Sequence, residues 1–414
     1  MEQKKSMDAK EIGKTIAALR KKGGMTQAQL AEKLHVSDKA ISRWENGNGF
    51  PEISLFPSLA EVFGVTVDYL LTGRRKGITV LGNILCDIVK TIDCYPKPGM
   101  LARILDVRRA VGGCVPNVTI DLAKIDRSVP VSALGKIGDD EYGRFVLAEM
   151  SRYGIDCEGV SVSPDQPTSF CDVMNLPSGE RTFFHARGSN ARFSPSDINL
   201  SSLGCAILHV GYILLLDEFD REDPEYGTVM ARFLHDAQAT GIRTSVDVVS
   251  DSRGEYKAKI FPVLPFCSYF IVNEIEATML SDLPAYDNDG NPDAKNILRT
   301  SELLAERGVS EKIVIHCRDA GFCYDVPSKR FTAVPSLRIP KEMIRGSVGA
   351  GDAFCAGCLY GLYHGYDDRR MLGFASAAAA CSLFAENSID GMLPKKEIEK
   401  IERQYERMPS CWSI

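Results

Sequence analysis

Long hydrophobic runs are missing from this chain of 414 residues. The longest apolar candidate, Ala206–Leu216, is shorter than the roughly 20 residues that a membrane-spanning helix needs, and it contains His209. The start of the chain has no apolar segment with a small-residue cleavage site behind it. We therefore expect a cytoplasmic protein without a membrane partner.

Common nucleotide-binding motifs are also missing. The sequence contains no GxxxxGK[ST] phosphate loop, no GxGxxG after an apolar strand and no pair of HRD and DFG motifs. If the protein uses a nucleotide, other backbone and side-chain groups must hold the phosphates.

The cysteines form no recognisable framework. Their number, 13, is odd, and they are scattered through apolar contexts, so we expect reduced and mostly buried thiols. Cys355 and Cys358 form a lone CxxC pair in a helical context. Without a second pair nearby, we expect neither a zinc site nor a redox site there.

What remains is an ordinary globular composition with an uneven charge. Apolar residues make up 44% and charged residues 25%, and the length predicts two or three domains. Residues 1–76 hold 13 Lys and Arg against 9 Asp and Glu, whereas the rest holds 36 against 46. A basic head on an acidic body predicts an anionic partner for the head alone.

The head has the pattern of short helices. Thr26 and Ser37 stand where the N-caps of two helices are expected, and Asn46-Gly47 predicts the end of the second. The stretches Thr26–Ala31, Val36-Ser37 and Ile41–Gly47 resemble the lambda-repressor-like (XRE) helix-turn-helix family.

This resemblance implies an all-α domain over residues 1–73 that binds double-stranded DNA. In such domains the second of the two helices enters the major groove and paired half-sites are read, so we expect a homodimer. The residues expected to face DNA are Gln27, Asp38, Lys39, Ser42 and Arg43. Asp38 either accepts a hydrogen bond from cytosine or weakens phosphate attraction. A helical head that binds protein instead of DNA is the alternative, and it predicts little salt dependence.

Beyond a polar linker at residues 74–77, short β-branched runs alternate with amphipathic stretches. This alternation predicts an α/β fold with a mainly parallel sheet. The stretch Thr168–Ala186 differs, because it predicts two strands around a hairpin turn at residues 177–180. Together with the segment near Thr91–Val111, it could form a small sheet that covers a site.

Gly349-Ala350-Gly351-Asp352 stands at the start of a helical stretch. Glycines at a helix start let backbone N–H groups converge on an anion, and the helix dipole adds attraction. A carboxylate in that turn can take a proton from a substrate hydroxyl while the amides hold a phosphoryl group. Taken alone, the residues fit equally well a helix cap at Asp352 with glycines that only permit close packing.

The same four residues resemble the C-terminal signature of the ribokinase/PfkB carbohydrate kinase family. Four other stretches fit that family in the right order, namely Gly82–Asp87, Gly112–Asn117, Gly135–Gly143 and Asn273–Glu276. The resemblance covers about residues 78–405. It implies a ribokinase-like α/β/α core with a parallel sheet and a small β lid, and ATP-dependent phosphorylation of a hydroxyl on a sugar or nucleoside.

The resemblance also implies roles for particular residues. Asp352 is the implied catalytic base, and the amides of Gly349, Ala350 and Gly351 form the implied anion hole. The implied substrate-binding residues are Asp87, Gly112, Gly113, Asn117 and Asn190. Asn273 and Glu276 are implied to hold Mg²⁺ and to orient the triphosphate.

Two departures from the family pattern favour a second hypothesis. The family usually has Asp-Thr before its signature, where this chain has Gly346-Ser347-Val348, so the use of a monovalent cation stays open. Near the adenine, Arg318–Gly321 retains only the second glycine of a family turn. In the second hypothesis the body binds a sugar as a signal with little or no catalysis, and the head regulates transcription.

Overall fold

The structure, a computed structural model, describes residues 8–73, 75–178, 180–250 and 255–410. Residues 1–7 and Arg74 of the predicted head and linker, and Gly179 of the predicted hairpin turn, lie outside the described residues. The chain divides into two units. The first runs up to Gly77 and includes Asn199–Ala206 and Ala239–Ile242, and the second holds the rest. The boundaries 1–73, 74–77 and 78–405 stay a prediction.

The described part of the head is helical, as predicted. Its elements are α1 (Ala9–Lys22), α2 (Gln27–Leu34), α3 (Asp38–Glu45), η1 (Ile53–Leu55), α4 (Phe56–Phe63) and α5 (Val67–Thr72). Both predicted N-caps are confirmed, because Thr26 Oγ1 accepts from the Gln29 N–H and Ser37 Oγ accepts from the Ala40 N–H, each at 3.2 Å. Each cap satisfies a backbone N–H of the first turn that has no partner within its helix.

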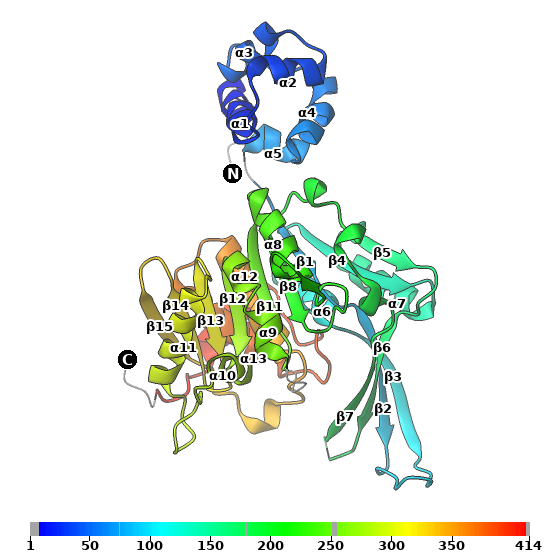
Figure 1. Cartoon of the computed structure of the whole chain (residues 1–414). Helices are drawn as coiled ribbons and strands as arrows, with labels where there is room; N and C mark the ends of the chain where they lie inside the picture. Colours follow the sequence, from blue (N-terminus) through cyan, green and yellow to red (C-terminus); the bar gives the residue numbers. More distant parts are fainter. Residues whose placement is uncertain (1–7, 74, 179, 251–254, 411–414) are drawn as a thin grey trace. The chain divides into compact units, whose positions relative to one another are not determined.

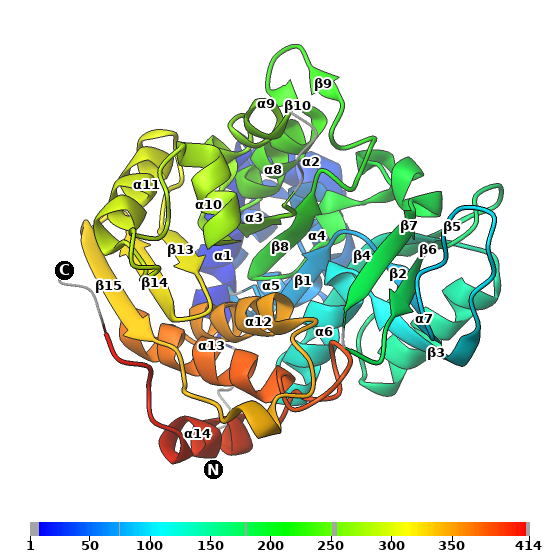
Figure 2. The same ribbon diagram turned by 90° about the horizontal axis from the view of Figure 1, so that it is seen from below.

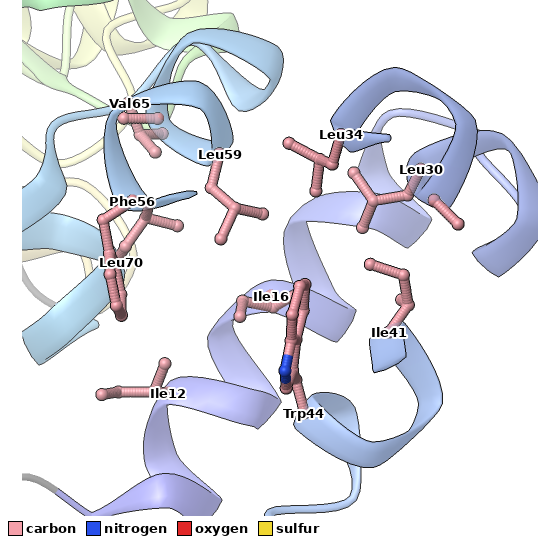
Figure 3. Packing of buried hydrophobic residues seen from close by; sticks show 12 residues of the cluster. Ile12, Ile16, Leu30, Leu34, Ile41, Trp44, Phe56, Leu59, Val65 and Leu70 are labelled. Carbon is pink, nitrogen blue, oxygen red and sulfur yellow. The ribbon is translucent and has the colours of Figure 1, made fainter. Parts of the chain in front are cut away.

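A single apolar core joins the helices of the head. Figure 3 shows Trp44 of α3 beside Ile16 of α1 and Ile41 of α3, with Leu30 and Leu59 facing the same interior. All five side chains are buried. Because each helix supplies only one apolar face, none of them could bury that face alone, and the head folds as a unit.

The body is built on a nine-stranded sheet in the order β15-β14-β13-β12-β11-β8-β1-β4-β5. Its pairs are parallel except β13–β14 and β14–β15, which are antiparallel. The strands are β1 (Ile78–Leu81), β4 (Val131–Gly138), β5 (Val160–Ser163), β8 (Ile207–Ile213), β11 (Arg243–Val248), β12 (Tyr269–Asn273), β13 (Lys312–His316), β14 (Ala320–Asp325) and β15 (Arg330–Pro335). The predicted parallel α/β sheet is confirmed, whereas the antiparallel edge was not predicted.

Helices cover both faces of this sheet. Figure 2 shows α8 (Val229–Ala239), α10 (Glu274–Ser281) and α11 (Ala294–Glu306) on one face, and α6 (Cys114–Ile125), α12 (Ala350–Tyr363) and α13 (Asp368–Ser382) on the other. The remaining helices of the body are α7 (Glu141–Arg152), α9 (Tyr256–Ile260) and α14 (Lys395–Gln404). The α12 helix is buried from Asp352 to Leu362, whereas Gly351 in its first turn is exposed.

A second, four-stranded sheet extends from the body in Figure 1, in the order β3-β2-β6-β7. It comprises β2 (Leu85–Ile92), β3 (Ile104–Gly112), β6 (Ser169–Asn175) and β7 (Arg181–Ala186). The two predicted hairpin strands are therefore present and join the segment near residues 91–111, as expected. The short pair β9 (Glu222–Asp223) and β10 (Gly227–Thr228) completes the strands of the described residues. Among those residues, no helix has both the length and the apolar character of a membrane span.

One buried carboxyl in the body has no partner. Asp121 of α6 is fully buried, and neither of its oxygens has a hydrogen-bond partner among the described residues. Burial, and then the charge of Asp352, raise the pKa of Asp121 well above its usual value. The folded protein therefore keeps this carboxyl protonated at pH values where the unfolded chain has already released the proton.

We expect the Asp121→Asn variant to gain stability relative to the wild type as the pH rises from 5 to 8. Between the unfolded and folded pKa values, the unfolded wild type binds fewer protons, so its stability falls with pH by about 1.4 kcal/mol per pH unit. Asparagine does not titrate, so the variant lacks this loss. Urea unfolding at both pH values measures the difference, and a difference that does not change with pH would contradict the assignment.

Candidate active site and DNA-binding surface

The first turn of α12 carries the predicted anion hole. Gly349 is the N-cap and has φ of 80°, and a Cβ there would lie 2.6 Å from the side chain of Ser388, so only glycine fits. N–H groups in the first turn of a helix have no partner within the helix. Two of these donors are the amides of Ala350 and Gly351. The Ala350 N–H donates to Ser347 O at 3.3 Å, so the Gly351 N–H is the more available of the two for an anion.

Asp352 lies in the same turn and is held by two donors. Its Oδ2 accepts from Asn117 Nδ2 and its Oδ1 from the Tyr212 hydroxyl, both at 2.8 Å. Ser388 Oγ donates to Asn117 Oδ1 at 2.8 Å, which orients the amide toward the carboxylate. Burial raises the pKa of Asp352 to about 6, while the bonds from Asn117 and Tyr212 act in the opposite direction. The carboxylate is thus ionised at neutral pH and more basic than an exposed aspartate.

The predicted substrate residues Asp87, Gly112 and Gly113 lie together at the base of the second sheet. Asp87 is in β2 and not in a turn, and burial followed by the charge of Asp352 raises its pKa to about 7. Gly112 ends β3 directly beside the Asp87 carboxylate. Gly113 has φ of 88°, and a Cβ would lie 2.6 Å from Asn83 O, so this bend requires glycine. The glycines therefore let the chain approach Asp87 closely.

Two of the predicted substrate residues have partners within the protein. The Asn117 side chain bonds Asp352 and Ser388, as described above. Asn190 is fully buried, and its amide both accepts from the Ile84 N–H and donates to Ile84 O, each at 3.1 Å. Asn190 thus ties its short helix to the turn after β1, and its role toward a substrate stays a prediction.

Asn273 and Glu276 form a capping box at the start of α10. Asn273 Oδ1 accepts from the Glu276 N–H at 2.9 Å, and Glu276 Oε2 accepts from the Asn273 N–H at 3.0 Å. Glu276 Oε1 accepts from Ser250 Oγ at 3.1 Å. Both residues border a cavity of about 250 Å³ that Asp247, Gly351 and Asp352 also line. The predicted phosphate and metal residues therefore share one cavity with the predicted base.

This cavity suits a hard cation. Asp247 and Glu276 supply carboxylate oxygens, the donor type that Mg²⁺ prefers, whereas Asn273 Oδ1 already accepts from the Ile275 and Glu276 N–H groups. Burial raises the pKa of both carboxyls, and the negative charges of Glu276 and Asp352 raise that of Asp247 further. A divalent cation would relieve this repulsion, so the residues present fit the metal.

The two departures from the family pattern are visible in the structure. At Gly346 a Cβ would lie 2.8 Å from Ala385 O, so the loop passes too close for the usual aspartate without a shift. The Arg318 side chain is mostly exposed and pairs with Asp319 at 3.0 Å. Neither residue joins the cavity that contains Asp352.

A larger cavity of about 710 Å³ lies on the second sheet. Asp87 and Val89 of β2 line it, as do Val348 and Ser388 near the start of α12. Through Ser388 and Asn117, the wall of this cavity is hydrogen-bonded to Asp352. The larger cavity can accommodate a sugar-sized molecule next to the carboxylates.

Sequence reasoning did not find Tyr212, Asp247 or Ser388. Tyr212 and Asp247 lie at or near the carboxyl ends of the neighbouring strands β8 and β11, where ligands of parallel sheets bind, and this rule could have indicated both. Tyr212 also has φ of 59°, an uncommon conformation for a bulky residue, which no sequence pattern indicates. Ser388 lies in an irregular loop with no signal.

In the head, the predicted DNA-facing residues lie on α2 and α3. Asp38, Lys39 and Arg43 are exposed, and Gln27 and Ser42 are half-buried. Asp38 Oδ1 accepts from the Lys39 N–H at 2.8 Å, so it occupies the first turn of α3.

Two of these side chains are held by bonds within the head. Gln27 Nε2 donates to Glu45 Oε2 at 2.8 Å, and Arg43 Nε donates to Asn48 O at 2.9 Å. Glu45 is also paired with Arg20 through Nε at 2.6 Å and Nη2 at 3.0 Å. This nearly buried bidentate pair fixes the end of α3 to α1.

Comparison with known proteins agrees with both units. Residues 76–396 match the pfkB family of carbohydrate kinases, and residues 16–70 match a helix-turn-helix family. The chain therefore belongs to the pfkB family of carbohydrate kinases and carries a helix-turn-helix domain in front of that region.

Similar curated proteins include a fructokinase-1 of Oryza sativa subsp. japonica, 24% identical over 80% of this chain and 99% of its own. A ribokinase of Bacillus subtilis is 24% identical, and the match covers 79% of this chain and 99% of the ribokinase. The solved Arabidopsis thaliana ribokinase with ribose and ATP has a TM-score of 0.66 at 20% identity and covers 80% of this chain and 99% of its own. The ribokinase-like fold with a small β lid is thus confirmed.

We expect the Tyr212→Phe variant to raise the pKa of Asp352 by about one to two units. The Tyr212 hydroxyl donates to the ionised carboxylate, and such a bond is worth about 1.5–3 kcal/mol, so its loss favours the protonated form. Carbon-13 NMR of labelled aspartate carboxyls measures the titration. Tyr95→Phe, which loses a bond to Met174 O on the second sheet, is the control. An unchanged titration in Tyr212→Phe would contradict this arrangement.

Proposed function

We propose that this protein is an ATP-dependent kinase for a hydroxyl of a sugar or nucleoside, and that its head binds double-stranded DNA. The observation that best supports kinase activity is the position of Asp352. This carboxylate lies in the first turn of α12, with Asp87 near it and Asn273 and Glu276 bordering the same cavity. The fructokinase, the ribokinases and a nucleoside kinase with inosine among the similar proteins support this acceptor class.

The proposed reaction begins at the acceptor hydroxyl. Asp87 binds a neighbouring hydroxyl, and Asp352 takes the proton from the reacting one. The substrate oxygen forms a bond to the γ-phosphorus of ATP while the bond to the bridging oxygen of ADP breaks, so ADP leaves and Asp352 keeps the proton. The amides at the start of α12 stabilise the charge on the transferred group.

Mg²⁺ bound at the 250 Å³ cavity would offset the charge of the triphosphate. A similar structure from E. coli that contains ATP and Mg²⁺, with a TM-score of 0.63, supports this cofactor. Asp247 and Glu276 would hold the metal, and Asn273 would keep Glu276 in position through the capping box.

Asp352→Asn should lower kcat by about a hundred- to ten-thousand-fold, since asparagine cannot accept the proton. The assay follows ADP release with a panel of sugars and nucleosides, ATP and Mg²⁺. Sugar binding by calorimetry should persist in the variant. Full kinase activity in Asp352→Asn would exclude the mechanism.

A sugar-sensing regulator with little catalysis is the second candidate. It is favoured by the tight backbone at Gly346, which leaves no room for the usual acid, and by the engaged amide of Ala350. In this case the wild type would bind a sugar without releasing ADP, and the sugar would change the affinity for DNA.

For the head, we expect Arg43→Ala to weaken specific binding of the full chain to DNA by about 5- to 150-fold. Arginine pairs bidentately with guanine, and such a pair contributes about 1–3 kcal/mol. Arg43 is exposed, and only its Nε is bonded to Asn48 O. Fluorescence anisotropy after selection of a duplex from a random pool measures the effect.

Lys14→Ala on α1 is the matched control, because Lys14 forms an exposed pair with Glu11 and is not among the DNA-facing residues. Equal loss in both variants would exclude base reading by Arg43. Absence of any salt-dependent DNA binding by the full chain would favour a protein-binding head. The proposed homodimer would read paired half-sites about 34 Å apart.

A further inference from the structure

The register of the second sheet decides which side chains face the 710 Å³ cavity. In β2, Asp87 and Val89 line it, and their partners across the strand pair are Ala110 and Arg108 of β3. Through β6, the same face continues to Arg181 of β7, which also lines the cavity. Because side chains alternate along a strand, these residues share one face of the sheet.

Four arginines line the cavity, and one of them, Arg109, is paired with Glu141 at 3.0 Å. Arg345 is the one that lies outside the second sheet. Arg345 lies in the loop before α12, and its backbone N–H donates to Leu383 O at 2.8 Å. Arg181 reaches the same neighbourhood, since its Nη2 donates to Glu386 O at 3.4 Å. Arginines from the sheet and from the body thus approach one rim of the cavity.

The acids of this cavity do not neutralise all of these arginines. Arg108 is paired with Asp106 at 2.7 Å and with Glu386 at 3.4 Å. Asp390, another acid of the lining, accepts from Asn387 Nδ2 at 2.8 Å. Asp87 lies at the far end, beside Gly112.

Arg181 and Arg345 are different from Arg108. Among the described residues, the Arg181 guanidinium has the Glu386 carbonyl as a partner and no acid. Among the same residues, Arg345 is bonded through its backbone N–H, and its guanidinium has neither a hydrogen bond nor an ion pair. Two guanidinium groups at the rim are therefore available to an anion, which arginine binds with parallel N–H donors.

We propose that the acceptor of this kinase carries an anionic group, a carboxylate or a phosphate, which Arg181 and Arg345 bind while its reacting hydroxyl lies at Asp87 and Asp352. This inference rests on the proposed function, because it assigns the substrate class of the same site.

The dimensions of the cavity agree with a substrate of this kind. Arg181 pairs with Asn175, and Asn175 pairs with Thr91, four residues beyond Asp87 on β2. The two positions are about 13 Å apart along the strands at about 3.3 Å per residue, and the two strand spacings between β2 and β7 add about 10 Å across the sheet, so the total separation is about 16 Å. The long arginine side chain shortens this separation. An open-chain or ring sugar with a terminal acid or phosphate spans the remaining distance.

The test compares three acceptor classes with the full chain, ATP and Mg²⁺. The neutral arm uses D-fructose and D-ribose, the carboxylate arm uses aldonates of four to six carbons, and the phosphate arm uses hexose 6-phosphates. We expect a higher kcat/KM in one of the two anionic arms, and which arm it is identifies the group. Arg181→Gln and Arg345→Gln should each raise KM for that acceptor about tenfold or more, and change the neutral arm less than twofold.

Arg144→Gln on α7 is the control, because Arg144 forms an exposed pair with Asp139 at 2.9 Å outside the cavity. Calorimetry with the Asp352→Asn variant measures binding of the same compounds without turnover. Anionic sugars that bind but are not phosphorylated, with binding lost in the two arginine variants, would support the inference while the kinase proposal fails. Turnover of neutral sugars with no preference for anionic ones, or equal effects of the arginine variants in all arms, would overturn the inference and leave the kinase proposal intact.

Discussion

The active-site region depends on the hydrogen bonds that hold the Asp352 carboxylate. Asn117 comes from α6, Tyr212 from the end of β8 and Asp352 from α12, so three elements distant in sequence meet at two oxygens. Bonds of 2.8 Å to both oxygens keep a buried carboxylate in one orientation without neutralising it with a cation. A base held in this way needs no rearrangement before it accepts a proton, which is how a preorganised site lowers a barrier.

Around this carboxylate the protein accumulates negative charge in a poorly solvated region. Asp87, Asp247 and Glu276 all have raised pKa values, and for each of them burial is the main cause. Such an arrangement costs folding free energy in the absence of ligands, and a bound cation would recover part of it. The capping box at Asn273 and Glu276 offsets some of the cost, because the Asn273 N–H bonds the Glu276 carboxylate and the Glu276 N–H bonds the Asn273 side chain.

Much of this organisation could be predicted from the sequence. The helix caps at Thr26 and Ser37 could be predicted because Thr and Ser side chains accept from the backbone N–H groups of a first turn. The alternation of strands and helices could be predicted from the spacing of the apolar residues. The site elements at residues 349–352 and 273–276 are contiguous, so their motifs are readable. The residues that were not predicted reach the site through tertiary structure. Tyr212 approaches Asp352 only because β8 ends beside α12, and Ser388 reaches Asn117 only through the bend of its loop.

The ion pair between Arg20 and Glu45 in the head bears on the proposed binding of DNA. Arg20 and Glu45 hold the end of α3, and Gln27 is already bonded to the same carboxylate. The position of Gln27 is therefore set before any DNA arrives, so little rotamer entropy is left to lose on binding. The same bond also limits Gln27. If its side chain turned toward a base, the nearly buried Glu45 carboxylate would lose one hydrogen-bond donor. The half-buried Gln27 is thus coupled to the Arg20–Glu45 ion pair, and a change in one requires a change in the other.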